Sequence, residues 1–119
     1  MRTKASAIKQ AFSQHVVDQM AEFAPVQAKA MFGGFGIYWQ GLMFALIVRE
    51  QLYFKADEQS AGEFTSRGLG PFTYESKGKT ASLKYYQAPP EVMEEPQQMA
   101  VWARLAYDCA LRRRKKPVR

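Results

Sequence analysis

The sequence predicts an α+β fold with a five-stranded antiparallel sheet, elements in the order α-β-β-β-α-β-β-α, and helices packed on one face. Two amphipathic helical patterns, one near each end of the chain, enclose segments in which aromatic and β-branched residues alternate with glycines. The chain has 119 residues, of which 47% are hydrophobic, and this is enough for one hydrophobic core but not for two. We therefore expect a single domain over residues 1–111.

A central hairpin is predicted for residues 31–48. Large apolar side chains recur through this stretch, and it contains no acidic or basic residue. Gly41 can adopt the positive φ that a tight turn between two strands requires. A polar reversal at Arg49-Glu50 then leads into a short third strand over residues 51–55. The first three strands should form an antiparallel meander.

Three glycines in the first of these strands need an explanation, because glycine forfeits packing in a strand. They are Gly33, Gly34 and Gly36. A phosphate-binding loop would place such glycines before a helix in a G-x-G-x-x-G or G-x-x-x-x-G-K-[ST] pattern, and neither pattern is present. We expect instead a curved strand on which a helix lies close.

Helices are predicted at both ends and in the middle. The first spans residues 6–23, where apolar side chains recur at spacings of four, four, four and three, and Pro25 ends it. The second spans residues 58–66, with Asp57 as its N-cap through the N–H of Ser60, followed by Gly68 in the left-handed conformation. It should bury Ala61 and Phe64.

A second hairpin and a last helix complete the pattern. Strands over residues 72–75 and 81–86 should be joined by a turn at Lys77-Gly78-Lys79. Pro96 suits the first position of the last helix, whose apolar face should pack tightly. That face consists of Met99, Trp102, Ala103, Ala106, Cys109 and Ala110.

The residues that could perform catalysis are few. The single histidine and the single cysteine, His15 and Cys109, lie on the first and last helices, and nothing in their spacing favours a nucleophile–base pair. Glu91 with Glu94 or Glu95 has the spacing of paired carboxylates, but these acids lie where they complement a helix dipole. We predict no catalytic residues, no metal site and no cofactor, so the chain is interpreted as a non-enzyme.

The positive charge is concentrated at the C-terminus. The formal net charge is +6, and six cations lie at or after position 112, so the preceding residues are balanced. We interpret residues 112–119 as a basic tail, whose candidate nucleic-acid-binding residues are Arg112, Arg113, Arg114, Lys115 and Lys116.

Lysines are also interleaved with tyrosines in the second hairpin, a combination that proteins use to bind single-stranded nucleic acid. They are Lys77, Lys79 and Lys84 with Tyr74, Tyr85 and Tyr86. A half-buried strand pair with a polar outer face has the same pattern. We favour that structural interpretation because Glu75 lies among the lysines.

An ordered series of short motifs resembles a known family. The motifs are Ala30 to Tyr38, Gly41 to Leu46, Leu52 to Asp57, Pro71 to Tyr74, and Tyr85 to Pro89. Together they resemble the N-terminal domain of the TfoX/Sxy proteins. The resemblance implies an α+β domain, and a role as a transcriptional co-activator of natural competence that acts with the cyclic-AMP receptor protein. Full-length members carry a second, helical domain, so we expect this chain to be a stand-alone N-terminal domain.

We therefore predict a non-enzymatic regulatory domain that acts through protein partners in transcription. The partners that the resemblance implies are the transcription machinery or the cyclic-AMP receptor protein. The alternative is a weak, sequence-nonspecific nucleic-acid binder acting through the tail. We expect a cytoplasmic protein without a membrane span, and self-association into a homodimer is compatible with the sequence.

Overall fold

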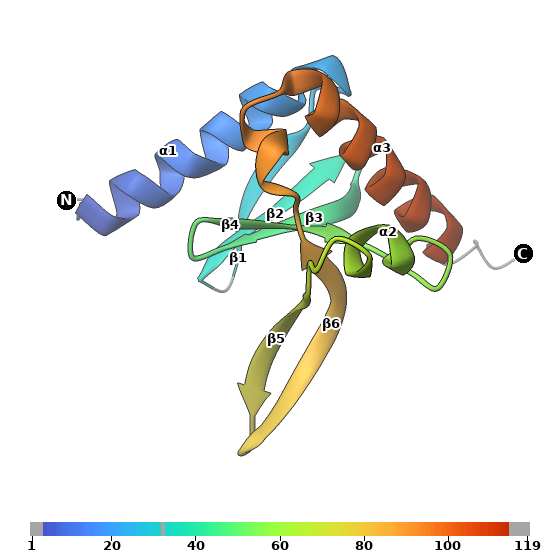
Figure 1. Cartoon of the computed structure of the whole chain (residues 1–119). Helices are drawn as coiled ribbons and strands as arrows, with labels where there is room; N and C mark the ends of the chain where they lie inside the picture. The colour runs from blue at the N-terminus through green and yellow to red at the C-terminus, as the bar shows by residue number, and fades with distance from the viewer. Residues whose placement is uncertain (1–3, 32, 115–119) are drawn as a thin grey trace, which may run out of the picture.

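The computed structural model describes residues 4–31 and 33–114 and shows helices over one side of an antiparallel sheet (Figure 1). The helical elements are α1 Lys4–Gln19, the 3₁₀ turn η1 Met20–Glu22, α2 Ala61–Thr65, the 3₁₀ turn η2 Pro90–Met93 and α3 Pro96–Arg113. The strands are β1 Gln27–Met31, β2 Gly34–Trp39, β3 Leu42–Val48, β4 Gln51–Lys55, β5 Pro71–Ser76 and β6 Lys79–Gln87. The α+β class is confirmed.

The sheet has six strands in the order β1-β2-β3-β4-β6-β5, so the prediction of five strands was wrong. The extra strand is β1, which pairs antiparallel with β2 from Gln27 opposite Tyr38 to Met31 opposite Gly34. Gly33 has φ +68° between the two strands, which lets the chain reverse inside what the sequence suggested was one strand. The sequence of β1, Gln-Ala-Lys-Ala-Met, has no β-branched or aromatic residue, so propensity did not indicate it.

The predicted reversals are present. Gly41 has φ +79° and the preceding Gln40 has φ 51°, which joins β2 to β3. Lys77 and Gly78 make the same kind of turn between β5 and β6, with φ 52° and 78°. Gly68 has φ +75°, the left-handed conformation expected of it. These turns follow from glycine's freedom to adopt positive φ.

The strand glycines have a different reason from the predicted one. A β-carbon on Gly34 would collide with the backbone carbonyl oxygen of Ile47 on the neighbouring strand. A β-carbon on Gly36 would lie 2.7 Å from the sulfur of Met43 and 3.0 Å from that of Met31. The space that a β-carbon would need at Gly34 and Gly36 is therefore taken by strand backbone and by strand side chains, not by a helix. Helix α1 does lie near this end of β2, where its Lys9 and Phe12 line a small hollow with Gly34.

The hydrophobic core lies between the sheet and the helices. It combines sheet residues such as Ile37, Phe44 and Phe54 with Met20 of η1 and Met99 of α3, all of them fully buried. An aromatic cluster extends the core at the end where β2 meets α3. Its ring centroids lie 4.9–5.8 Å apart in five pairs formed by Phe23, Trp39, Phe44 and Tyr107. Burial of these rings fixes the helical layer on the sheet.

Helix α2 is shorter than predicted. Asp57 accepts the predicted hydrogen bond from the N–H of Ser60 at 3.2 Å, but residues 58–60 form a turn and the helix begins at Ala61. Ser60 N–H and Gln59 N–H share the same carboxylate oxygen, so this carboxylate stabilises a turn before the helix. The predicted burial of Phe64 is confirmed, and its ring packs against Trp102 at 5.1 Å.

Candidate interaction surface

The face of the sheet opposite the helices, called the open face here, carries many apolar and aromatic side chains. Strand alternation and the pairing register bring them together from all six strands. The residues are Met31, Tyr38, Met43, Leu46, Val48, Tyr53, Phe72, Tyr74, Leu83 and Tyr85. In the part of the chain that the structure describes, the helices lie on the other side of the sheet, and this face has no helical layer (Figure 1).

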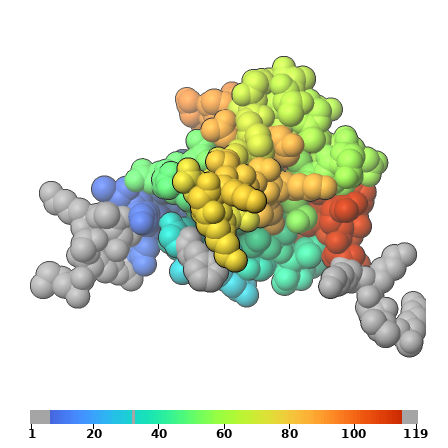
Figure 2. All heavy atoms as spheres, turned by 90° about the horizontal axis from the view of Figure 1, so that it is seen from below, coloured from blue at the N-terminus to red at the C-terminus, as the bar shows by residue number. Residues whose placement is uncertain are grey.

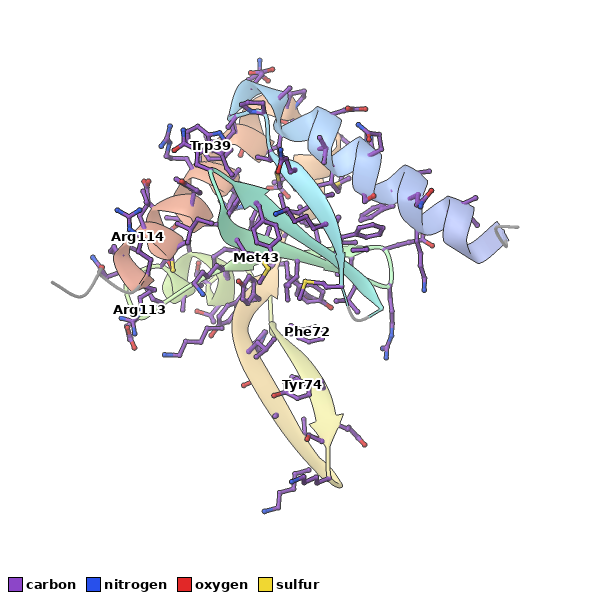
Figure 3. The ribbon with its side chains drawn as sticks, turned by 180° about the vertical axis from the view of Figure 1, so that it is seen from behind. Trp39, Met43, Phe72, Tyr74, Arg113 and Arg114 are labelled. Carbon is purple, nitrogen blue, oxygen red and sulfur yellow. The ribbon has the colours of Figure 1, made fainter. Side chains whose placement is uncertain are left out.

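A two-stranded arm projects from this side of the molecule (Figures 1 and 3). It consists of residues 71–83 of β5 and β6 with their turn. Strand β4 pairs with β6 where residues 53–55 lie opposite residues 85–87, and one further bond runs from Ala56 N–H to Lys84 O, so the arm extends beyond its neighbour in the sheet. Figure 3 shows Phe72 and Tyr74 on the arm, with Met43 on the sheet above them.

An apolar groove of about 370 Å³ lies where the arm meets the central strands, and we call it the arm groove. It is lined by Met31, Gly34, Phe35, Leu46, Ile47, Val48, Phe72, Tyr74 and Leu83. Three of the side chains are well exposed: Met31 by 38%, Tyr74 by 42% and Leu83 by 39%. Seen from below, the arm (yellow) rises toward the viewer from this side of the molecule (Figure 2). A concave apolar surface of this kind is typical of binding sites.

Ring contacts hold in place the wall of the arm groove that the arm forms. The ring of Phe72 lies 5.2 Å from that of Tyr53 in an edge-to-face arrangement and 6.2 Å from that of Tyr74 in a stacked one. Because Tyr53 lies on β4 and the other two rings on β5, these contacts hold the base of the arm against the sheet. The groove therefore has a shape before any partner binds.

Three lysines also lie on the open face, outside the lining of the arm groove. Lys29 lies over the ring of Tyr38, 4.9 Å from its centroid, and Lys55 lies over the ring of Tyr85 at 5.1 Å. Lys79 occupies the same face of the arm, two positions from Ala81, which pairs with Tyr74. None of the three lysines forms an ion pair within the described residues. Burial raises the pKa of Tyr85 to about 12.

The first residue of the predicted basic tail is part of the folded domain. Arg112 lies in the last turn of α3 and donates two hydrogen bonds to the carboxylate of Asp57, from Nε to Oδ2 and from an η nitrogen to Oδ1, each 3.1 Å long. Arg113 also lies in α3, and Arg114 follows it; both are exposed. Lys115 and Lys116 lie outside the described residues.

The Asp57–Arg112 pair has a strong electrostatic effect on both groups. The hydrogen bonds from Arg112 lower the pKa of Asp57 to about 2, although burial of the carboxylate opposes this. The same bonds raise the pKa of Arg112. Since the side chain of Asp57 is only 3% exposed, a paired cation is what makes its ionised form tolerable there. The pair therefore joins the end of α3 to the β4–α2 connection.

The candidate catalytic groups are not brought into a reactive arrangement. His15 is exposed on α1, whereas Cys109 is buried in α3, and burial raises the pKa of its thiol. Glu91 forms an ion pair with Arg67 at 3.3 Å. Over residues 4–31 and 33–114, no group of three or more His, Cys, Asp or Glu side chains could hold a metal ion. No helix in the same ranges is long and apolar enough to span a bilayer.

The lysines and tyrosines of the second hairpin are divided between the two faces. Tyr86 packs against Phe64 in the helical layer at 5.5 Å, and Lys84 pairs with Glu58 at 3.4 Å. Tyr74, Tyr85 and Lys79 lie on the open face with the groove. Sequence reasoning noted the interleaving but missed the open face. The alternation of Phe72 with Tyr74 and of Leu83 with Tyr85 is the signal that could have indicated it.

Comparisons with known proteins identify the family. The family model for the TfoX N-terminal domain matches residues 18–110. The chain is 22% identical over 95 residues to Protein Sxy of Escherichia coli (strain K12), an alignment that covers 80% of this chain and 46% of that protein. The chain thus spans about half the length of this curated relative. Because the family model covers most of the chain, including the open face and most of α3, this protein belongs to the TfoX N-terminal domain family.

Proposed function

We propose that this domain is a non-enzymatic regulatory module that acts through protein partners in transcription, in the cytoplasm, in connection with natural competence. Membership in the TfoX N-terminal domain family, with similarity to Protein Sxy, is the observation that carries the proposal. By the same resemblance, its partners are RNA polymerase or the cyclic-AMP receptor protein.

The surface chemistry supports a binding role. The open face presents a preformed apolar groove with exposed Met31, Tyr74 and Leu83, the kind of patch that monomeric proteins seldom expose without a partner. Of the titratable groups considered for catalysis, His15 is exposed, Cys109 is buried and Glu91 is held in an ion pair. The open face is therefore a stronger candidate for the functional surface than any of these groups is for a catalytic site.

Direct binding to purified partners tests the proposal. The immobilised protein should retain purified RNA polymerase or the cyclic-AMP receptor protein, measured by biolayer interferometry with and without cyclic AMP. In cells, its expression should raise transcription from a competence promoter fused to a reporter. If neither purified partner binds and the reporter does not respond, the proposed function is wrong.

Nucleic-acid binding through Arg112, Arg113, Arg114, Lys115 and Lys116 is the second candidate function. The exposed side chains of Arg113 and Arg114 at the end of α3 favour it, whereas the pairing of Arg112 with Asp57 leaves that guanidinium less available for phosphate. Removal of residues 113–119 should abolish binding to duplex DNA while Arg112 keeps the fold intact. Unchanged affinity after this deletion would rule out the second candidate.

A further inference from the structure

We propose that the arm groove binds an acidic amphipathic segment of a protein partner, in which apolar anchor residues alternate with Asp or Glu. The inference deepens the proposed function and rests on it, because it identifies the surface through which the domain would contact its partner. It follows from the apolar lining of the groove and from the charges on the open face.

The lining of the groove supplies the binding energy. The floor comes from β3, where Leu46 and Val48 point away from the helices, and the wall comes from the arm, where Tyr74 and Leu83 are 42% and 39% exposed. Met31 closes the groove on the side of β1 and is 38% exposed. Apolar anchors that enter this concavity would remove the exposed surface of Met31, Tyr74 and Leu83 from water, and such central anchors usually dominate affinity.

The charges around the groove determine which anchors it prefers. Lys29, Lys55 and Lys79 lie on the open face, and none of the strand positions that the register places on this face is Asp or Glu. At the β3–β4 turn, Glu50 is accompanied by Arg49, so this end of the groove adds no net negative charge. Glu75, which lies among the lysines in the sequence, follows Tyr74 on β5 and so points to the opposite side of the arm. A partner that carries acids beside its apolar anchors would therefore complement the groove electrostatically.

A second copy of this chain fits the same surface less well. A symmetric dimer through the open face would place this face against itself. Each copy would then bring Lys29, Lys55 and Lys79 and no acid from the strands, so the contact would gain apolar burial but no ion pairs, and like charges would approach.

Single-stranded nucleic acid also fits less well, although it is anionic. Base stacking needs free aromatic faces. The ring of Phe72 is flanked by Tyr53 and Tyr74, and the rings of Tyr38 and Tyr85 are each covered by a lysine of this chain. Much of the remaining lining is aliphatic or methionine.

Fluorescence anisotropy with three labelled probes tests the inference on the full chain. The first probe is a short peptide in which Leu and Phe alternate with Glu and Asp. The second has the same apolar residues with Lys in place of the acids, and the third is oligothymidine. We expect the acidic peptide to bind and the basic peptide to bind at least tenfold more weakly, because only the charge differs.

Two pairs of variants locate the site. Leu83→Glu removes an anchor contact and repels the acidic peptide, so we expect binding weaker by roughly tenfold or more. Ser82→Glu places the same charge one residue away on the opposite face of the arm and should leave binding unchanged. Lys29→Gln should weaken binding about two- to fivefold. Lys84→Gln removes a lysine from the other face and should leave peptide binding unchanged. Circular dichroism confirms that each variant is folded.

The outcomes separate this inference from the proposed function. If Leu83→Glu and Ser82→Glu affect the acidic peptide equally, or if the basic peptide or oligothymidine binds best, the groove assignment is wrong. The groove assignment is also wrong if the peptide does not bind and light scattering detects a dimer that Leu83→Glu converts to a monomer.

If RNA polymerase or the cyclic-AMP receptor protein binds the Leu83→Glu variant as well as the wild type, the groove inference fails and the proposed function stands. If neither of these partners binds but the acidic peptide does, the proposed function fails and the groove inference stands.

Discussion

Replacing Asp57 with Asn should flatten the dependence of stability on pH in the acid range. The hydrogen bonds from Arg112 lower the pKa of Asp57 from 3.8 to about 2 in the folded protein. Above the ordinary pKa, the paired carboxylate is ionised in both folded and unfolded chains, and its full stabilisation is present. As pH falls through 3.8 toward about 2, the unfolded chain takes up a proton before the folded one, so stability is lost.

The size of the effect follows from the same difference in pKa. The interval between 3.8 and about 2 corresponds to about 2.5 kcal/mol of preference for the ionised carboxylate in the folded state. The side chain of Arg112 is 35% exposed, so solvent screens part of this interaction. We therefore expect Asp57 to account for a loss of about 1–2 kcal/mol in the free energy of unfolding between about pH 5 and pH 2.

Urea unfolding, followed by circular dichroism at a series of pH values, measures this loss. The Asp57→Asn variant should be less stable than the wild type at neutral pH, and the difference between them should shrink as pH falls. Glu58→Gln is the matched control, because Glu58 pairs with Lys84 on the surface with both side chains more than two-thirds exposed, at 74% and 67%. It should unfold like the wild type. Parallel stability curves for the wild type and Asp57→Asn over the acid range would refute the assigned role of the pair.

Three further outcomes are expected. Gly34→Ala should lower the free energy of unfolding by roughly 1–3 kcal/mol, because the new β-carbon meets strand backbone. Gly62→Ala, whose β-carbon has no atom within 4 Å, should raise the free energy of unfolding by up to about 1 kcal/mol. Equal effects of the two substitutions in thermal unfolding would contradict this. Arg113→Gln with Arg114→Gln should reduce the slope of log K against log salt on duplex DNA by about two, and an unchanged slope would exclude these contacts. In a spectrophotometric titration, Tyr85 should ionise only near pH 12, because burial disfavours the phenolate, and Tyr85→Phe should remove that late step.

Local signals predicted most of the elements correctly. The turn at Gln40-Gly41, the left-handed Gly68 and the Asp57–Ser60 hydrogen bond each depend on neighbouring residues, so the sequence was sufficient for them. Strand β1 was missed because its residues lack β propensity and because its partner strand, not its own composition, makes it a strand. Helix α2 was predicted too long because Asp57 stabilises a turn as readily as a helix start.

The candidate site depended on contacts that sequence spacing does not reveal. Asp57 and Arg112 are 55 positions apart, so nothing local marked Arg112 as a structural residue and it was grouped with its basic neighbours. The groove joins Met31 of β1 to Leu83 of β6, which lie on nonadjacent strands. The period-two alternation was readable, but which side of each strand the helices would cover was set by the packing of the whole core.

The arm also has a consequence for how the molecule unfolds. Its distal residues depend on each other for hydrogen bonds, because β6 is joined to the central sheet only near its root, by the pairs between residues 53–55 and 85–87 and by the flanking bonds from Ala56 N–H to Lys84 O and from Ala88 N–H to Leu52 O. A two-stranded ribbon with so little support can fray without disturbing the core. Amide hydrogen exchange should therefore be fast at the tip of the ribbon and slow at its root, while global melting reports only the core. Fraying of this kind would leave the base of the arm, and with it the arm groove, in place, because the ring contacts of Phe72 hold that base against the sheet.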